Sequence, residues 1–285
     1  MTATNSRQSS VVEKFHALHA SGCFVLPNPW DAGSAIYLEQ LGFKALASTS
    51  AGFAFSRGLP DSPSGVSREL VLTHLRELVE ATSLPVNADF QNGYANSAED
   101  LAESVKLCVA TGVAGLSIED NSENPGAPLY DFQTAVDRVK AARAAIDATG
   151  TSVVLTARCE AWLVGQANPL QVAIERLAAF AEAGADCLYA PGVRQPDEIA
   201  AIVKAVVPKP VNVLVSTGNR ELTFSQLADL GVRRISVGSA LANVAWGAFI
   251  RAAREIAETG KFDAFANAAS FAELNKLFAS RMQPV

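Results

Sequence analysis

The segment "SVVLTARCEAWLVGQANPLQVAIERLAAFAEAGADCLYA" (residues 152–190) contains one complete strand–helix–strand unit. Residues 152–158 form a short apolar, β-branched run, which is typical of a strand. Residues 168–185 carry apolar residues at helical spacing and end in Ala-Gly-Ala, where glycine is the usual terminator of a helix. Residues 186–190 begin the next apolar run. This order predicts two parallel strands joined by a helix.

The alternation of short apolar runs and amphipathic segments continues along the chain. Eight runs have strand character: 23–27, 45–49, 85–89, 113–119, 152–158, 186–190, 211–215 and 233–238. Ser97 and Asp131 stand at predicted helix N-caps, and Gly42, Gly112 and Gly231 stand at predicted helix ends. Eight strand–helix units in about 250 residues predict a (β/α)8 barrel of the TIM type.

A doubly wound open sheet is the competing interpretation. It would favour a G-x-G-x-x-G turn after the first strand, and "LPNPWDAGS" (26–34) does not supply one. The chain has 285 residues, is 49% hydrophobic and lacks a Pro/Gly/Ser-rich linker in its middle. We therefore expect a single barrel domain over residues 1–285.

The C-terminal tail carries an apolar stripe with no strand left to cover. Four phenylalanines recur there at roughly helical spacing: Phe262, Phe265, Phe271 and Phe278. We expect residues 262–285 to form an extra helical oligomerisation segment that packs on a partner subunit and could be exchanged between subunits of a dimer or tetramer. Docking of this tail on its own barrel is the alternative.

Composition excludes several classes of partner. The net charge of −6 and the absence of a Lys/Arg run disfavour nucleic acid. The polar N-terminus and the lack of a stretch of about 18 apolar residues predict a cytoplasmic protein that does not enter a membrane. The four cysteines are widely spaced, so neither a disulfide framework nor a zinc knuckle is indicated.

The active site of such a barrel lies at the C-terminal ends of its strands. Carboxylates and one arginine stand there: Asp89, Glu119, Arg158 and Glu160. The three histidines lie in segments that precede strands, and no lysine stands at a strand end, which disfavours a Ser-His-Asp triad, a histidine-bound zinc and Schiff-base chemistry. Oxygen ligation of a hard cation remains, and Mg²⁺ is the cation that this chemistry favours.

Each of these side chains also has an ordinary structural interpretation. Asp89 could cap a backbone amide in the turn that follows it. Glu119 could form a salt bridge with a barrel arginine, and Arg158 could be that arginine. We favour instead an Arg158 that binds a substrate carboxylate or phosphonate, because its planar fork matches such groups.

Four motifs in order resemble the phosphoenolpyruvate mutase/isocitrate lyase superfamily, in particular its poorly characterised, 2-methylisocitrate lyase-like branch. They are "ALASTSAGFAFSRGLPDS" (45–62), "NADFQNGY" (87–94), "SIEDN" (117–121) and "TARCEA" (156–161). The resemblance implies an enolate-forming enzyme with Mg²⁺ near Asp89, contacted directly or through water by Asp61 and Glu119. It also implies a substrate carboxylate held around Thr49, Ser50 and Ala51, and a second anionic oxygen held by Arg158.

Two departures from the superfamily pattern stand out. Gln91 replaces the second acid of the D-x-D-x-G motif, which removes one negative charge from the expected metal site. The loop "NSENPGAPLYD" (121–131) lacks the K-K-C-G-H sequence of the isocitrate and methylisocitrate lyases and the mutase's K-T-N stretch. Cys159 is not expected to replace the missing cysteine, because it alternates with Arg158 along the strand end and should point away from it.

The sequence therefore predicts a Mg²⁺-dependent carbon–carbon lyase acting on a small 2-oxo or 2-hydroxy dicarboxylic acid through a pyruvate-type enolate. A phosphonopyruvate-type mutase or hydrolase and an inactive carboxylate-binding barrel are the alternatives. Arg158 and Glu160 are the catalytic candidates, and the acid–base role stays open between Glu160, Asp31 and a metal-bound water. Tyr94 is expected to contact the substrate at the mouth. The sequence leaves the identity of the dicarboxylate open.

Overall fold

The computed structural model describes residues 3–62, 64–218 and 222–279. Eight parallel strands form a nearly closed barrel in the order β1-β8-β7-β6-β5-β4-β3-β2. The strands are β1 Phe24–Leu26, β2 Leu46–Ala47, β3 Val86–Asp89, β4 Gly115–Glu119, β5 Val154–Arg158, β6 Cys187–Tyr189, β7 Val211–Leu214 and β8 Arg234–Ser236. Each lies inside a predicted run, so the predicted barrel is confirmed. At the open seam, the Ala47 N–H donates to the Pro27 carbonyl at 3.0 Å.

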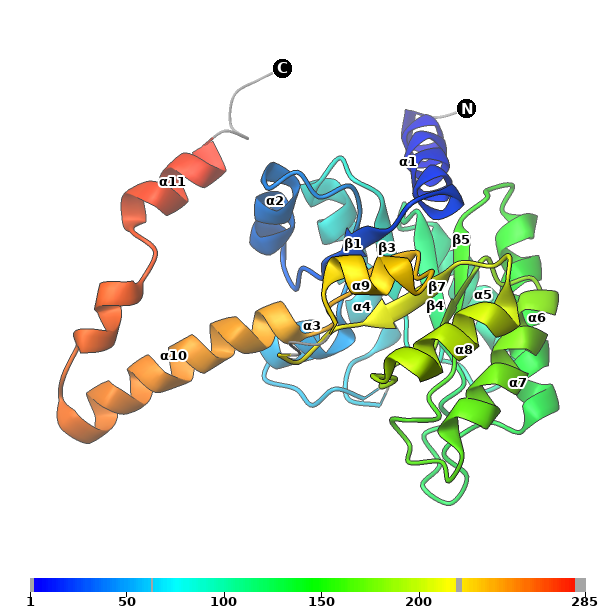
Figure 1. Cartoon of the computed structure of the whole chain (residues 1–285). Coiled ribbons are helices and arrows are strands. Elements are labelled where there is room, and N and C mark those ends of the chain that lie inside the picture. The colour runs from blue at the N-terminus through cyan, green and yellow to red at the C-terminus, as the bar shows by residue number, and fades with distance from the viewer. Residues whose placement is uncertain (1–2, 63, 219–221, 280–285) are drawn as a thin grey trace.

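Most of the helices surround the strands, and the last of them lie on an arm that leaves the barrel (Figure 1). The helices are α1 Ala3–Ala20, α2 Ala32–Gln40, α3 Ser50–Ser56, α4 Arg68–Ala81, α5 Ala98–Val109, α6 Phe132–Ala148, α7 Pro169–Glu182, α8 Pro196–Val206, α9 Phe224–Asp229, α10 Ala240–Thr259, the 3-10 turn η1 Asp263–Asn267, and α11 Phe271–Ala279. The short helix α3 follows β2 directly and brings the first motif of the sequence onto the mouth of the barrel. No described helix has both the length and the apolar character needed to cross a membrane.

The predicted helix ends are present. The side chains of Ser97 and Asp131 accept hydrogen bonds from backbone N–H groups three residues on, which satisfies donors that a helix start leaves free. The four glycines before strands, Gly42, Gly112, Gly184 and Gly231, have φ values of 86°, 92°, 104° and 87°. A residue with a side chain would be strained there, so these positions fix where each helix stops.

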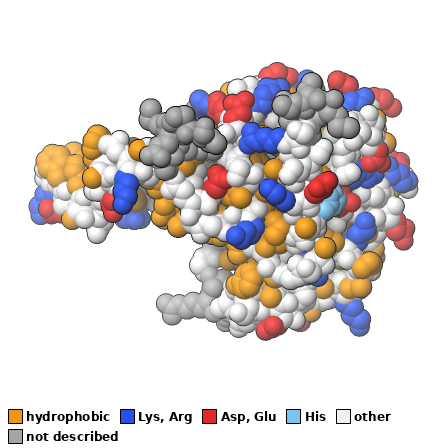
Figure 2. All heavy atoms as spheres, turned by 90° about the horizontal axis from the view of Figure 1, so that it is seen from above, with side chains coloured by type: hydrophobic (Ala, Val, Ile, Leu, Met, Phe, Trp, Pro, Cys, Tyr) orange, Lys and Arg blue, Asp and Glu red, His pale blue; other side chains and the backbone are white. Residues whose placement is uncertain are grey.

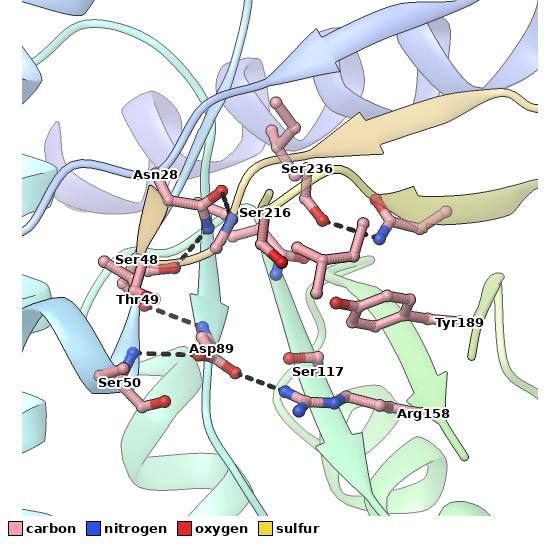
Figure 3. A pocket seen from close by; sticks show the side chains of 18 of the residues that line it. Asn28, Ser48, Thr49, Ser50, Asp89, Ser117, Arg158, Tyr189, Ser216 and Ser236 are labelled. Carbon is pink, nitrogen blue, oxygen red and sulfur yellow. Dashed lines mark hydrogen bonds and ion pairs between the residues drawn. The ribbon is translucent and has the colours of Figure 1, made fainter. Parts of the chain in front are cut away.

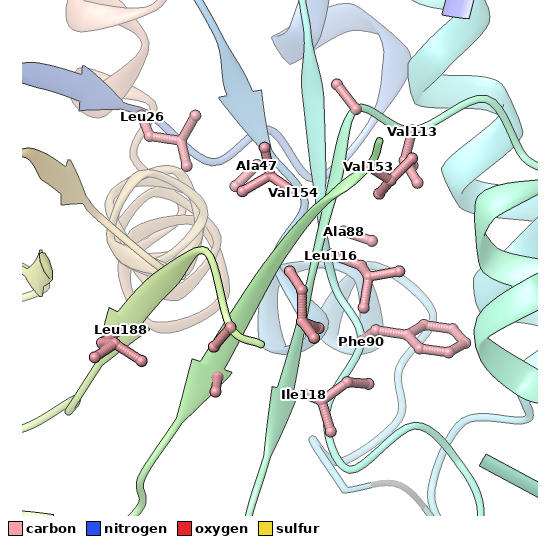
Figure 4. Close-up of a cluster of buried hydrophobic side chains, with 14 of the residues drawn as sticks. Leu26, Ala47, Ala88, Phe90, Val113, Leu116, Ile118, Val153, Val154 and Leu188 are labelled. Carbon is pink, nitrogen blue, oxygen red and sulfur yellow. The ribbon is translucent and has the colours of Figure 1, made fainter. Parts of the chain in front are cut away.

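The alternation of side chains along β3, β4, β5, β7 and β8 separates an apolar layer from a largely polar one. On β5, Leu155 and Ala157 belong to the apolar core between strands and helices, part of which is drawn in Figure 4. Thr156 and Arg158 occupy the other face of that strand, toward the barrel interior. The buried polar residues of this interior are Asn87, Ser117, Thr156, Asn212, Arg234 and Ser236. Branched apolar residues usually fill such a space, so a polar filling points to a function.

The C-terminal arm, residues 240–279, leaves the barrel after β8 (Figure 1). Only Ala242 of α10 is buried, although a helix in this position would ordinarily cover the barrel. Over residues 262–279 the predicted tail is helical in two pieces, η1 and α11, and residues 280–285 of that prediction lie outside the described part of the chain. The end of α11 touches α2, where Gln40 Nε2 donates to the Leu277 carbonyl at 3.0 Å. Own-barrel docking, the alternative interpretation, therefore applies to this end of the arm.

Candidate active site

A cavity of about 290 Å³ opens at the C-terminal ends of the strands and reaches down into the barrel. Its walls are formed by Leu26, Asn28, Ala47, Ser48, Thr49, Ser50, Ala51, Asp61, Asn87, Asp89, Ser117, Arg158, Leu163, Tyr189, Asn212, Leu214, Ser216, Arg234, Ser236, Gly238 and Ser239. Figure 3 shows the labelled side chains converging from several strands. Of the residues assigned from sequence, Thr49, Ser50, Ala51, Asp61, Asp89 and Arg158 line this cavity.

Asp89 is the last residue of β3 and is held from three sides. Its backbone N–H donates to Ser48 Oγ at 2.8 Å, and its Oδ2 accepts the Ser50 N–H at 3.0 Å. Arg158 Nη1 lies 3.3 Å from its Oδ1. Asp89 thus does cap a backbone amide, but one in the first turn of α3 rather than in its own turn. The carboxylate is fixed in place at the mouth of the cavity.

Arg158 binds carboxylates of the protein itself. Its Nη1 lies 3.2 Å from Glu119 Oε2, and its Nη2 lies 3.2 Å from Glu160 Oε2, while Nε donates to the other Glu160 oxygen. The salt bridge between Glu119 and a barrel arginine, an alternative from the sequence, is therefore present. Burial raises the pKa of Glu119 well above its usual range and also raises that of Glu160, while Arg158 acts against both shifts. The arginine is what keeps two buried acids ionisable.

Asp61 and Gln91 complete an oxygen-rich corner beside Asp89. Gln91 Nε2 donates to Asp61 Oδ1 at 3.0 Å, and Gln91 Oε1 is buried with no hydrogen-bond partner among the described residues. Burial and then the charge of Asp89 raise the pKa of Asp61. Two neighbouring carboxylates on one cavity wall, Asp61 and Asp89, are oxygen donors that suit a hard divalent cation. These residues therefore fit Mg²⁺.

Glu119 does not join this corner. Among the described residues, no three His, Cys, Asp or Glu side chains are grouped so that together they could hold a metal ion. Glu119 is 7% exposed and bound to Arg158, and it does not line the cavity. The expected contact of Glu119 with a cation at Asp61 and Asp89 therefore stays a prediction.

Two other assigned residues lie off the cavity wall. Glu160 is 3% exposed and reaches the site only through Arg158. Tyr94 faces a separate cleft with Asn92 and Glu123, and its ring packs edge-on against Phe90 at 5.2 Å between centroids. Burial raises the pKa of Tyr94, so its hydroxyl stays protonated.

Two further residues considered from the sequence have clear structural roles. Asp31 forms a capping box with Ser34 at the start of α2, with a 2.7 Å bond from the Ser34 N–H, and is exposed. Cys159 is fully buried in the apolar core and points away from Arg158, as the strand alternation predicts. Burial raises the pKa of this thiol, so it is a poor acid or nucleophile.

Sequence reasoning missed the inner wall of the cavity. Tyr189 on β6 places its ring 5.3 Å from the Arg158 guanidinium, and its hydroxyl faces the cavity (Figure 3). Asn212 and Arg234 lie deeper, on β7 and β8. The signal that could have found them is the period of two along each strand, which puts these polar residues in line with the inward face.

The match to a protein-family model and to individual proteins is extensive. The model described as phosphoenolpyruvate phosphomutase matches residues 15–257. A solved structure from Burkholderia cenocepacia J2315, provisionally described as a lyase/mutase, is 44% identical, with a TM-score of 0.92 over 96% of this chain and 98% of that chain.

Two further proteins carry named activities. The oxaloacetate decarboxylase of Pseudomonas savastanoi pv. phaseolicola is 32% identical over 232 residues, covering 77% of this chain and 75% of that protein. A phosphonopyruvate hydrolase, solved in complex with oxalate and Mg²⁺, is 26% identical, with a TM-score of 0.82 over 95% of each chain.

Proposed function

The chain belongs to the phosphoenolpyruvate phosphomutase family, and we propose that within it the protein is a Mg²⁺-dependent carbon–carbon lyase for a small 2-oxo or 2-hydroxy dicarboxylic acid. The superfamily resemblance read from the four motifs is thereby confirmed. The family comprises lyases and mutases, and relatives of this chain include a decarboxylase and a hydrolase. The proposal adds the bond that is broken and the metal.

One observation carries the proposal. Asp61, Asp89 and Arg158 face the same cavity as the turn at Thr49, Ser50 and Ala51, so a cation site and anion donors adjoin a single bound molecule. The Ala51 N–H and the Arg158 N–H group that its protein partners leave unused can bind a carboxylate, while Asp61 and Asp89 would hold Mg²⁺. When bound, the metal would supply Lewis-acid stabilisation of negative charge on the substrate.

The reaction needs groups that hold charge and protons in fixed positions. Cleavage leaves an electron pair on the carbon next to the carbonyl, so an enolate forms and a proton must then be added; oxaloacetate would give carbon dioxide and pyruvate. Arg158 stabilises the developing charge without moving, because Glu119 and Glu160 fix its guanidinium. Tyr189 remains a hydrogen-bond donor toward the cavity because burial raises its pKa. We assign Glu160 as a positioning residue that acts through Arg158.

Pyruvate release from a panel of acids tests this proposal. The panel contains oxaloacetate, 2-methylmalates, methylisocitrate and phosphonopyruvate, with Mg²⁺ present or chelated and enzyme-free reactions as blanks. We expect release from one of the carbon acids that stops on chelation and returns when Mg²⁺ is added. Pyruvate release that is unchanged by chelation would contradict the proposed Mg²⁺ dependence. Tight binding of one of the acids without pyruvate release from any of them would favour the inactive carboxylate-binding barrel.

The alternative of phosphonate chemistry has one observation in its favour. A mutase or hydrolase acting on a phosphonopyruvate-like compound would need more positive charge in its site than Arg158 alone provides, because a phosphonate is more negatively charged than a carboxylate. The cavity contains a second arginine, Arg234, that the sequence analysis did not place there. Pyruvate release from phosphonopyruvate alone in the same panel would select the hydrolase, and conversion of phosphonopyruvate to its phosphoenol isomer without pyruvate release would select the mutase.

We also propose that a second copy of this chain covers the C-terminal arm. Large apolar side chains stand exposed along α10, with Val244 70% and Phe249 60% exposed, and hydrophobic side chains gather on the projecting arm in Figure 2. The arm continues into Phe262 and Phe271, which are also exposed. An apolar surface of this kind on a projecting helix is typical of an interface between subunits.

Charge placed on the arm is therefore expected to dissociate the oligomer. Val244→Glu with Phe249→Glu should convert a dimer or tetramer into a monomer in light scattering coupled to size exclusion, because two carboxylates would have to be buried at the interface. Glu258→Gln with Lys261→Gln, on the same arm, is the matched control and should leave the mass unchanged. A monomeric wild-type chain would contradict the proposal.

A further inference from the structure

Arg234 is a buried cation without an acidic partner. It is the first residue of β8, 2% exposed, and lines the inner end of the cavity. Its guanidinium donates to Asn212 Oδ1 at 2.8 Å and Thr156 Oγ1 at 3.0 Å, and lies 3.3 Å from His19 Nε2. No ion pair to Arg234 exists among the described residues. A buried charge left unpaired costs several kcal/mol, so its retention calls for an explanation.

The three groups around Arg234 are all neutral. Burial, and after it the positive charge of Arg234, lowers the pKa of His19 to about 3. The imidazole ring of His19 therefore carries no charge at neutral pH. His19 Nδ1 lies 2.7 Å from the Phe15 carbonyl, which leaves Nε2 as the acceptor toward Arg234. The guanidinium has five N–H groups, more than these three acceptors use. Charge and donors are therefore both left over.

A second buried residue that lines this cavity has a polar atom without a hydrogen-bond partner. Asn87 on β3 is 3% exposed and lines the cavity, and its Oδ1 has no hydrogen-bond partner among the described residues. Its Nδ2 donates to the Ala88 carbonyl at 3.1 Å. A buried acceptor without a partner is rare. The inner end of the cavity is thus lined by two polar residues whose hydrogen-bonding capacity is not fully used, Arg234 and Asn87.

The depth of Arg234 can be set against that of Arg158. Thr156, which contacts Arg234, is two residues before Arg158 on β5. The Cα atoms of Thr156 and Arg158 are therefore about 6.6 Å apart along the strand. The two guanidinium groups therefore belong to successive inward layers of one cavity. Figure 3 shows Tyr189 between Arg158 and Ser236. Arg158 is balanced by three carboxylates, whereas Arg234 is not.

We propose that the inner end of the cavity is a second anion subsite, in which Arg234 binds the distal carboxylate of the substrate. The 2-oxo acid end would lie at the mouth, with Asp61, Asp89 and Arg158. This assignment rests on the proposed function and makes a dicarboxylate, rather than a monocarboxylate, the preferred ligand. The carboxylate would neutralise the only charge of the inner layer described above.

Calorimetric binding of three non-cleaved acids tests the subsite without turnover. Oxalate probes the mouth alone, and 2-oxoglutarate and 2-oxopentanoate differ only by a distal carboxylate in place of a methyl group. With Mg²⁺ present, we expect wild type to bind 2-oxoglutarate about tenfold or more tightly than 2-oxopentanoate, and Arg234→Gln to remove that difference while leaving oxalate binding unchanged. Arg233→Gln is the matched control, because this neighbour is on the outer face and donates to the Gly22 carbonyl.

The remaining outcomes decide against the subsite or separate it from the proposed function. A preference that is absent in wild type, or that survives in Arg234→Gln, would overturn it. If Arg234→Gln does not fold, by circular dichroism, Arg234→Lys replaces it and should lose most of the preference, since the fork is gone. If oxalate binds neither with nor without Mg²⁺, the proposed function fails. Crystals soaked in bromide then test the anion subsite by itself: an anomalous peak at Arg234 supports the subsite, and the absence of a peak there overturns it.

Discussion

Asp89→Asn is expected to reduce kcat/KM for pyruvate release by about a thousandfold or more. Asparagine keeps the size of the side chain and an oxygen that can accept the Ser50 N–H, which lies 3.0 Å from Asp89 Oδ2. It removes the charge that would bind Mg²⁺ beside Asp61. Losing metal stabilisation of several kcal/mol in the transition state corresponds to this factor, at about 1.4 kcal/mol for each tenfold.

The control for this variant is Asp147→Asn. Asp147 is 65% exposed and pairs with Arg143 on the outside of α6, so its charge cannot reach the cavity. Its kcat/KM should stay within about twofold of wild type, as expected for a surface pair. Asp89→Asn with activity within about tenfold of wild type would remove Asp89 from the metal site.

Arg158→Met is expected to lower the free energy of unfolding by about 3–5 kcal/mol at neutral pH. The variant leaves Glu119 and Glu160, which are 7% and 3% exposed, without their cation. Methionine fills the space of the arginine stem but cannot compensate two buried carboxylates. Chemical denaturation followed by fluorescence measures the loss. Arg57→Met, in the C-cap of α3 and exposed, is the control.

The same loss should depend on pH in a defined direction. Burial raises the pKa of both glutamates, and removal of Arg158 takes away the charge that acts against this shift. In the pH range above the usual glutamate pKa of about 4.3, the folded variant then binds more protons than the unfolded chain. Its stability therefore falls as pH rises and recovers as pH falls.

Denaturation at about pH 8 and about pH 5 compares the two conditions. The deficit of Arg158→Met relative to wild type should be smaller at the lower pH. Adding Glu119→Gln to Arg158→Met should restore part of the stability at the higher pH, because one unpaired charge is gone. An equal deficit at both pH values, or a loss below about 1 kcal/mol, would contradict the assignment of Arg158 as the compensating charge.

The barrel was predictable because its signals are local. Each of the eight strands lies within one apolar run, and Gly184 ends its helix because a φ of 104° is strained for other residues. The cap at Asp131 depends only on the residues that follow it. The break between η1 and α11 was not predicted, since the phenylalanine spacing alone does not show where a helix ends.

The site was predictable in its members but not in its pairings. Because Asp89 and Arg158 stand at predicted strand ends, the sequence predicts that both lie at the mouth of the barrel. Only the structure shows that Arg158 forms ion pairs with three carboxylates of the protein. The sequence indicates that Gln91 replaces a metal-binding acid. The structure shows that its side chain donates a hydrogen bond to Asp61, which lies 30 residues earlier in the sequence. Arg234 was read as part of a strand, because the sequence does not say which strand face meets the cavity.

The most direct test of the account is a crystal structure with oxalate and Mn²⁺, whose anomalous signal reports the place of the metal. We expect the ion in contact with Asp89 and Asp61, and oxalate between that ion, Arg158 and the turn at residues 49–51. A metal bound elsewhere, or oxalate bound on Arg158 with no ion beside Asp89, would contradict a metal-dependent lyase at this site.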